Sequence, residues 1–267
     1  MKRVFHLATL LLFNCLLLTS IQAQDKTAAG VYNEGLALLK AKDYEQGLVL
    51  MEEALGLAEQ EENEQVLKLA KKNGSVAASN VGNSSYKAGE FDKAMEFYMK
   101  GLEMNPENVS CLLGKARVLD KQDMKAEAVS TFIDAGDMYV ASEKADRAEK
   151  VYKQAQTIVG KLYVGKDYDK AIEAGMAHLE KRDNAEVYYY MSRCQLEKKN
   201  NEDALQYISK AIELATAGEN VDDKYYMALG ISLENLGRND EAVEAYKKIT
   251  GEKYKSNAEY RVKTIQG

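Results

Sequence analysis

The sequence has few of the residues that interrupt helices. Pro106 is the only proline among 267 residues, whereas alanine, leucine, glutamate and lysine are frequent. Proline breaks helices and those four residues favour them, so we expect helix almost everywhere beyond residue 23. No low-complexity linker divides this part of the chain. We therefore expect one continuous array over residues 24–267.

Residues that could carry out catalysis or bind a metal are equally scarce. His178 is the only histidine after residue 23, and one histidine does not make a metal site. The sequence contains no P-loop, no nucleotide-binding glycine fingerprint and no serine elbow. Its adjacent carboxylates lie in charged helical stretches without an apolar pocket that would shift their pKa values. The sequence predicts no catalytic, metal or cofactor site, and hence a non-enzymatic protein.

The charge of the chain is acidic. It has 36 basic and 42 acidic residues, a net charge of −6, and an isoelectric point near 5.3. A protein that binds phosphate backbones normally presents a basic face and has a high isoelectric point. We therefore expect no nucleic acid among its partners.

The first 23 residues have the pattern of a secretory signal peptide. Lys2 and Arg3 precede an apolar run over residues 4–18, which is followed by Ala23 at the expected cleavage site. The run is shorter than the roughly 20 residues of a membrane-spanning helix. We expect cleavage, and export to the periplasm or outside the cell with no integral membrane segment left; retention as an uncleaved anchor is the alternative.

The remaining chain repeats one spacing of small and large residues. Residues 75–108 carry it most clearly, at Val81, Gly82, Gly89, Ala94, Tyr98 and Pro106. Small residues let two helices approach closely, and a large residue fills the space beside them. This segment resembles the tetratricopeptide repeat family. Aligning the chain on it gives repeats at 28–61, 75–108, 109–142, 152–184, 185–218 and 223–256, with a cap at 257–267.

The resemblance implies an all-α fold. The fold would be a right-handed solenoid, or α-α superhelix, of about six helix pairs with a capping helix. In such a fold each pair buries its apolar face only by stacking on the next pair. Cys111 and Cys194 would then lie two repeats apart, too far for a disulfide, and we expect both thiols to be buried. His178 falls at a close-packed position and is expected to be a packing residue.

Two insertions interrupt the regular spacing. The first covers residues 62–74, is charged, and is predicted to lengthen the flanking helices; the second lies near residues 143–151. Insertions can form the binding face of a repeat array, or they can be solvated helical ridges.

Function is expected on the concave face that the resemblance assigns to the first helix of each pair. Steps of three and four residues keep one helical face, and tyrosines with flexible cations suit an extended peptide. An ordinary exposed helix face has a similar composition, so both interpretations stay open. The predicted groove residues are Tyr32, Leu36, Leu39, Lys40, Asn83, Tyr86, Lys87, Leu113, Arg117, Lys121, Gln156, Tyr163, Tyr189, Arg193, Leu196, Lys224 and Met227.

The sequence therefore predicts a protein-protein interaction scaffold of the cell envelope that binds peptide or protein segments in this groove. The alternatives are a structural homo-oligomer, with residues 62–74 as its interface, or an accessory subunit of an envelope enzyme. Some family members bind chaperone tails through a clamp of charged and amide side chains. Asn83 sits at one clamp position, but Ser79, Ser110 and Gly114 occupy others, so chaperone-tail binding is not expected.

Overall fold

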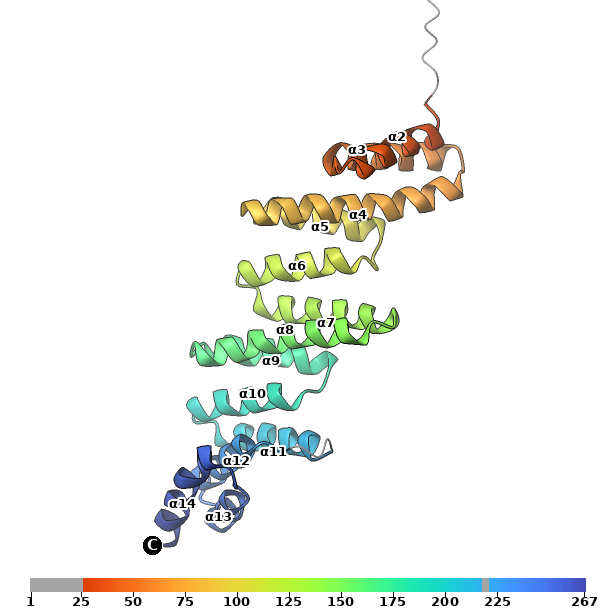
Figure 1. Cartoon of the computed structure of the whole chain (residues 1–267). Helices are drawn as coiled ribbons and strands as arrows, with labels where there is room; N and C mark the ends of the chain where they lie inside the picture. Colours follow the sequence, from red (N-terminus) through yellow and green to blue (C-terminus); the bar gives the residue numbers. More distant parts are fainter. Residues whose placement is uncertain (1–25, 218–220) are drawn as a thin grey trace, which may run out of the picture. The chain divides into compact units, whose positions relative to one another are not determined.

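A computed structural model describes residues 26–217 and 221–267 (Figure 1). The predicted signal peptide, residues 1–23, lies outside the described residues. All regular secondary structure in the described part of the chain is helical, which confirms the all-α prediction. These residues form two compact units. The N-terminal unit comprises residues 26–81 and 100–106, and the C-terminal unit comprises residues 82–99, 107–217 and 221–267.

We expected one array, and the division into two units has a physical reason. In a stacked array each repeat contacts only its neighbours, so no central core ties distant repeats together. Helices α4 (Glu64–Ala88) and α5 (Phe91–Met104) contribute residues to both units.

The N-terminal unit contains α2 (Ala28–Lys40), α3 (Tyr44–Gln60) and the beginning of α4. The caps follow from the sequence: the side chain of Thr27 accepts a hydrogen bond from the Gly30 amide, and that of Asp43 accepts one from the Gln46 amide. Small and aliphatic side chains from all three helices form one core, composed of Ala28, Val31, Tyr32, Met51, Ala54, Ala58, Val66 and Ala70.

The C-terminal unit continues as helix pairs. The pairs are α6 (Val109–Lys121) with α7 (Lys125–Ala141), α8 (Ala145–Val164) with α9 (Tyr168–Lys181), α10 (Ala185–Glu197) with α11 (Asn201–Ala217), and α12 (Asp223–Asn235) with α13 (Asn239–Lys247). They are followed by α14 (Glu252–Gln266). Within each pair, Figure 1 shows the two helices joined by a short turn. The first helices α8, α10, α12 and α14 contact one another in order, and each also contacts the second helix of the preceding pair.

The predicted register of small and large residues is confirmed by burial. The ring of Tyr98 is 1% exposed. A Cβ atom on Gly114 would lie only 2.2 Å from that ring, and one on Gly82 only 2.7 Å from it. Tyr246 packs against Gly230 in the same way, with a would-be Cβ 2.2 Å from the ring. Glycine is required at these contacts because a side chain would occupy the space of the ring.

The turns within the pairs share one conformation. Each turn contains one residue with a left-handed backbone and φ between 62° and 81°. In chain order these residues are Lys42, Gly89, Asp123, Lys166, Lys199 and Gly237. A residue with positive φ ends a helix and reverses the chain in few residues. Only two of these positions carry glycine, although glycine adopts this conformation without steric cost. The regular recurrence of this turn supports the predicted helix pairs.

The two insertions lengthen first helices, as predicted for residues 62–74. That insertion forms the first turns of α4, which is 25 residues long, and residues 145–151 form the first turns of the 20-residue α8. The end of the chain differs from the expected bounds. Helix α13 ends at Lys247 and α14 begins at Glu252, five residues before the cap expected at 257. The Gly251 backbone is extended at φ −78° and ψ 136°, and this breaks the helix earlier than the repeat spacing indicated.

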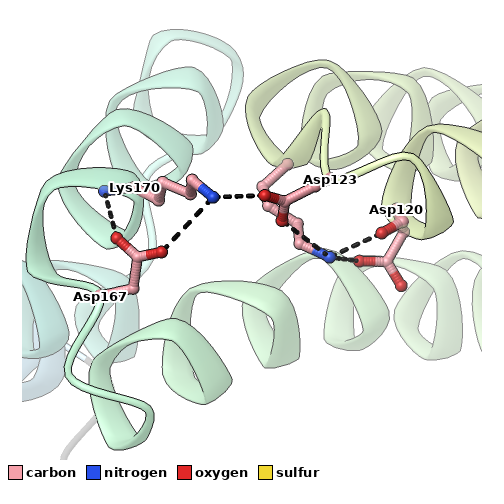
Figure 2. A network of polar contacts seen from close by, with 5 residues as sticks. Asp120, Asp123, Asp167 and Lys170 are labelled. Carbon is pink, nitrogen blue, oxygen red and sulfur yellow. Dashed lines mark hydrogen bonds and ion pairs between the residues drawn. The ribbon is translucent and has the colours of Figure 1, made fainter.

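Polar contacts connect the turn of one pair to the next pair in the C-terminal unit. Asp123, in the turn between α6 and α7, pairs with Lys170 near the start of α9. Figure 2 shows Lys170 between Asp123 and Asp167, and Asp120 on the other side of the network. Asp169 pairs with Lys198 one repeat further on. The Lys170 hydrogen bond lowers the pKa of Asp123. These pairs are exposed, so each contributes little stability, but together they align successive turns.

Candidate functional site

The predicted groove residues of the N-terminal unit lie mostly in or beside its core. Tyr32 is 9% exposed, and its hydroxyl accepts a hydrogen bond of 2.8 Å from the Asn73 amide group. Leu36 and Leu39 are partly buried and pack against the same core, whereas Lys40 is exposed. Among the predicted groove residues of this unit, only Lys40 therefore offers an exposed side chain to a ligand.

The predicted residues between Asn83 and Lys121 are more accessible than those of the N-terminal unit. Asn83 is engaged, because its side-chain oxygen accepts a hydrogen bond of 2.9 Å from the Tyr98 hydroxyl. Tyr86 makes an edge contact with Phe91, with ring centroids 5.4 Å apart. Leu113 is partly buried. The exposed cations among these predicted residues are Lys87, Arg117 and Lys121.

A cluster of tyrosines forms where α8, α10 and α12 meet in the C-terminal unit. Tyr163 from α8 lies with its ring centroid 5.8 Å from that of Tyr190 on α10. Tyr190 neighbours Tyr189 at 5.6 Å, and Tyr189 neighbours Tyr225 of α12 at 5.5 Å. Tyr168, at the start of α9, lies 6.3 Å from Tyr163. We call the set of Tyr163, Tyr168, Tyr189, Tyr190 and Tyr225 the tyrosine cluster.

The tyrosine cluster has both buried and accessible rings. Tyr189 and Tyr225 are 8% and 6% exposed, so they form its floor. Tyr163, Tyr168 and Tyr190 are only partly buried. The expectation that Tyr189 faces outward is wrong, because the neighbouring rings of Tyr190 and Tyr225 and the side chain of Lys224 pack around it. A ligand on this face would contact the accessible rings.

Two cations, Lys224 and Arg193, lie beside the tyrosine cluster, and Lys224 forms an ion pair with a carboxylate. Glu186 Oε2 lies 2.7 Å from Lys224 Nζ and accepts a hydrogen bond of 3.0 Å from the Tyr225 hydroxyl. Burial alone would lower the pKa of Lys224, but the hydrogen bond and charge of Glu186 outweigh it, and the pKa is raised. Lys224 is therefore a charged group held in place, with its ammonium 5.3 Å from the centre of the Tyr189 ring.

The second cation, Arg193, interacts with the Tyr189 hydroxyl but lies farther from its carboxylate partner than Lys224 does. Its guanidinium carbon lies 5.7 Å from the centre of the Tyr163 ring, and its closest carboxylate oxygen, on Glu197, is 3.9 Å away. The Nε of Arg193 is buried and has no hydrogen-bond partner. The side chain is still 26% exposed. Guanidinium groups bind carboxylates through paired N–H donors, so Arg193 can bind a carboxylate of a ligand.

The tyrosine hydroxyls of the cluster stay protonated at neutral pH. Burial raises the pKa of Tyr163, and burial together with Glu186 raises that of Tyr190 to about 12. Neutral hydroxyls donate as well as accept hydrogen bonds. The cluster thus offers apolar rings, hydroxyl donors and one poorly paired guanidinium on the same face.

Part of this cluster was predicted from the sequence and part of it was not. Tyr163, Tyr189, Arg193 and Lys224 are predicted groove residues that the structure brings together. Tyr168, Tyr190, Tyr225 and Glu186 were not predicted. Glu186 lies three residues before the predicted groove residue Tyr189, so applying the steps of three and four fully would have found it. The rings of Tyr190 and Tyr225 could not be found that way because they occupy the contact between neighbouring first helices.

Three further predicted residues lie on the same helices. Gln156 on α8 and Leu196 on α10 are partly buried, and Met227 on α12 is 5% exposed. Met227 belongs to the core around α12, α13 and α14. It therefore supports the packing of these helices and offers a ligand almost no surface.

His178 and the two cysteines are buried, as expected. His178 is 0% exposed, and its Nδ1 lies 3.0 Å from the Arg182 carbonyl oxygen. Burial lowers the pKa of His178. Cys111 and Cys194 do not form a disulfide, and burial raises the pKa of the Cys194 thiol to about 12.

Across residues 26–217 and 221–267, no three acidic, histidine or cysteine side chains come together as metal ligands. Within the same residues, no helix has the length and apolar character needed to cross a membrane. The insertion at the start of α4 packs its apolar side chains into the N-terminal core through Val66 and Ala70. The residues that it leaves exposed are Glu62, Glu64, Gln65, Lys68, Lys71 and Lys72.

Comparison with known proteins agrees with the repeat pattern. The sequence profile of the family described as "Tetratricopeptide repeat" matches residues 77–108 and 223–253. Photosystem I assembly protein Ycf3 of Synechococcus sp. (strain CC9605) is 31% identical over 138 residues, which cover 52% of this chain and 70% of that protein.

Two other similarities cover different shares of their proteins. The Hsp70-Hsp90 organizing protein of Triticum aestivum is 28% identical over 173 residues, or 62% of this chain, and the match spans 29% of that protein. Among solved structures, MamA is 21% identical and aligns over 70% of this chain and 94% of its own, with a TM-score of 0.38. From the two matched repeats and from the identity and coverage of the Ycf3 match, the chain belongs to the tetratricopeptide repeat family.

Proposed function

We propose that this protein is a non-enzymatic scaffold that binds an extended peptide segment of a partner protein on the face formed by α8, α10 and α12. The observation that carries the proposal is the poorly paired Arg193 beside accessible tyrosine rings. Members of the family mediate interactions between proteins, and two relatives are named as an assembly protein and an organizing protein.

The chemistry of the face indicates how a peptide would be held. The rings of Tyr163 and Tyr190 offer apolar area at low entropic cost, and their hydroxyls can bond to a peptide backbone. Arg193 would pair with a carboxylate of the peptide, while Glu186 keeps Lys224 from competing for it. The expected ligand is thus an extended segment with apolar residues and at least one acidic residue.

The apolar run and charged start of residues 1–23 support export as part of this proposal. The partner would then be an envelope or secreted protein. Intact-mass measurement of the protein from its native host tests this directly. A chain that begins near Gln24 supports export, and a chain that retains Met1 contradicts cleavage.

Peptide binding can be tested without knowing the partner. Random peptides displayed on phage are selected on the whole chain, and the affinity of the selected peptides is measured by calorimetry. Tyr163→Ala combined with Arg193→Ala should weaken binding by at least about tenfold, since removal of a central anchor often costs 2 kcal/mol or more.

A matched control lies on the second helix of the same repeat. Glu173 and Met176 on α9 are exposed, so replacing both with alanine should leave peptide affinity unchanged. Retained affinity in the Tyr163/Arg193 variant, with loss in the α9 control, would place the binding surface on the second helices and contradict the proposal.

A further inference from the structure

A second surface lies at the C-terminal end, separate from the tyrosine cluster. It is a groove of about 420 Å³ between α13 and α14, which we call the C-terminal groove. Its floor contains Tyr246, Ile249 and Ala258, which are 1%, 7% and 3% exposed, together with the partly buried Val262. An apolar floor between two helices has the dimensions into which side chains of a third helix can pack.

The repeat pattern shows what kind of element fits the groove. Each of the first helices α8, α10 and α12 is contacted by the helix that follows it, and α9 also contacts the second helix before it, α7. Helix α14 contacts α12 and α13 as a first helix does, but among the described residues no further helix packs on it. A helix that followed α14 in this pattern would contact α14, and the groove lies between α14 and the second helix before it, α13; among the described second helices, α7 and α9 make such a contact. The position of the groove therefore suits an α-helix.

The rim of the groove is basic. Lys247, Lys255 and Lys263 line it, with Glu259 as the only acidic side chain. Lys247 already pairs with Glu244 at 2.9 Å. No ion pair in the described part of the chain engages the side chains of Lys255 or Lys263. These two ammonium groups are available to carboxylates of a bound molecule.

The charge of the surrounding segment is opposite to that of the chain. Residues 247–267 contain six lysine or arginine residues and two glutamates, whereas the whole chain has a net charge of −6. A local excess of positive charge attracts acidic surfaces and accelerates their association. The groove thus combines a helix-shaped apolar floor with a rim that is complementary to acidic residues.

We propose that the C-terminal groove docks an acidic amphipathic helix of a partner protein. Apolar residues of that helix, three and four positions apart, would cover Tyr246, Ile249 and Val262. Its flanking glutamates or aspartates would meet Lys255 and Lys263. An anionic lipid surface would use the same lysines but would leave the recessed floor between the helices unfilled.

A synthetic helix provides the probe. A fluorescent peptide of roughly 18 residues, about five helical turns, carries leucines on one face and glutamates on both flanks. The whole chain should bind it about tenfold or more tightly than the same peptide with lysines in place of the glutamates, and added salt should weaken binding. Lys255→Glu combined with Lys263→Glu should reduce the affinity for the acidic peptide at least about tenfold.

Lys150→Glu combined with Lys153→Glu is the matched control. Both residues are exposed on α8, so the variant makes the same charge change away from the groove, and it should bind the acidic peptide as the unchanged chain does. Circular dichroism confirms that both variants fold. Equal binding of the acidic and basic peptides, or equal loss in the two variants, would overturn the proposal.

The same variants distinguish a partner helix from two other possible ligands of the C-terminal groove. Binding to phosphatidylserine vesicles that requires Lys255 and Lys263, without binding of the acidic peptide, would identify a membrane surface instead. A doubled mass in light scattering that Lys255→Glu with Lys263→Glu abolishes would identify a second copy of the chain. Either result contradicts docking of a partner helix and leaves peptide binding at α8, α10 and α12 unaffected.

Discussion

Gly114→Ala should destabilise the protein although alanine is the better helix former. Gly114 lies inside α6, where alanine is favoured over glycine by about 0.8 to 1 kcal/mol. The added Cβ, however, would lie 2.2 Å from two atoms of the Tyr98 ring. That ring cannot easily move away, because Gly82 faces it too and its hydroxyl donates to Asn83. The two effects therefore oppose each other.

The steric effect should be the larger one. Forcing extra volume into a packed core costs about 1 to 3 kcal/mol, and the confined ring favours the upper part of that range. Subtracting the helix preference leaves a net loss of about 1 to 2 kcal/mol. Gly56 in α3 is the matched control, because a Cβ there would have no neighbour within 4 Å. Gly56→Ala should raise stability by about 0.8 to 1 kcal/mol.

Urea unfolding followed by circular dichroism measures both changes. The midpoint should fall for Gly114→Ala and rise for Gly56→Ala. In a Tyr98→Leu background the ring is absent, so Gly114→Ala should lose its destabilising effect, and the non-additivity measures the contact. A Gly114→Ala variant as stable as the unchanged protein would refute the close packing of Gly114 against Tyr98.

Three further predictions follow from single residues. Lys166 holds φ at 62°, so Lys166→Gly should raise the urea midpoint by the equivalent of about 0.5 to 1 kcal/mol; a lower midpoint would contradict strain at this turn. Burial lowers the pKa of His178, so the unfolded chain binds a proton more readily near its usual pKa of about 6.5. Stability should be complete above that pH and fall below it, and His178→Leu should flatten this dependence between about pH 7.5 and 5.5; an unchanged slope would exclude His178 as its source. Burial raises the pKa of Cys194 to about 12, so a thiol reagent should modify it only in urea; rapid reaction of the folded protein would disagree.

The pairing of helices could be predicted because it depends on local spacing. Gly82, Ala94 and Tyr98 recur at positions that must be small or large for two helices to pack, and the structure buries all three. The insertion at residues 62–74 was predicted to lengthen the flanking helices for a similar local reason, since it is helix-favouring and continuous with the next repeat. Residues 64–74 form the first turns of α4, which is 25 residues long.

Features that depend on neighbouring repeats could not be predicted. Tyr189 belongs to the expected groove stripe, but rings from α10 and α12 cover it. The pair between Asp123 and Lys170 joins residues 47 positions apart, more than the length of one repeat. The start of α14 at Glu252 depends on the early end of α13, which the 34-residue period does not encode. Local spacing thus determines each helix pair, whereas side chains between pairs determine the surface that a ligand meets.

The most direct test of the proposed binding face is hydrogen–deuterium exchange of the whole chain with and without a phage-selected peptide. Bound peptide shields backbone amides beneath and beside it, and it stabilises the helices that it contacts. Our account predicts slower exchange in α8, α10 and α12, with little change in α11 and in α9 beyond its first turn at Tyr168. Protection confined to α9 and α11 would contradict binding at the tyrosine cluster.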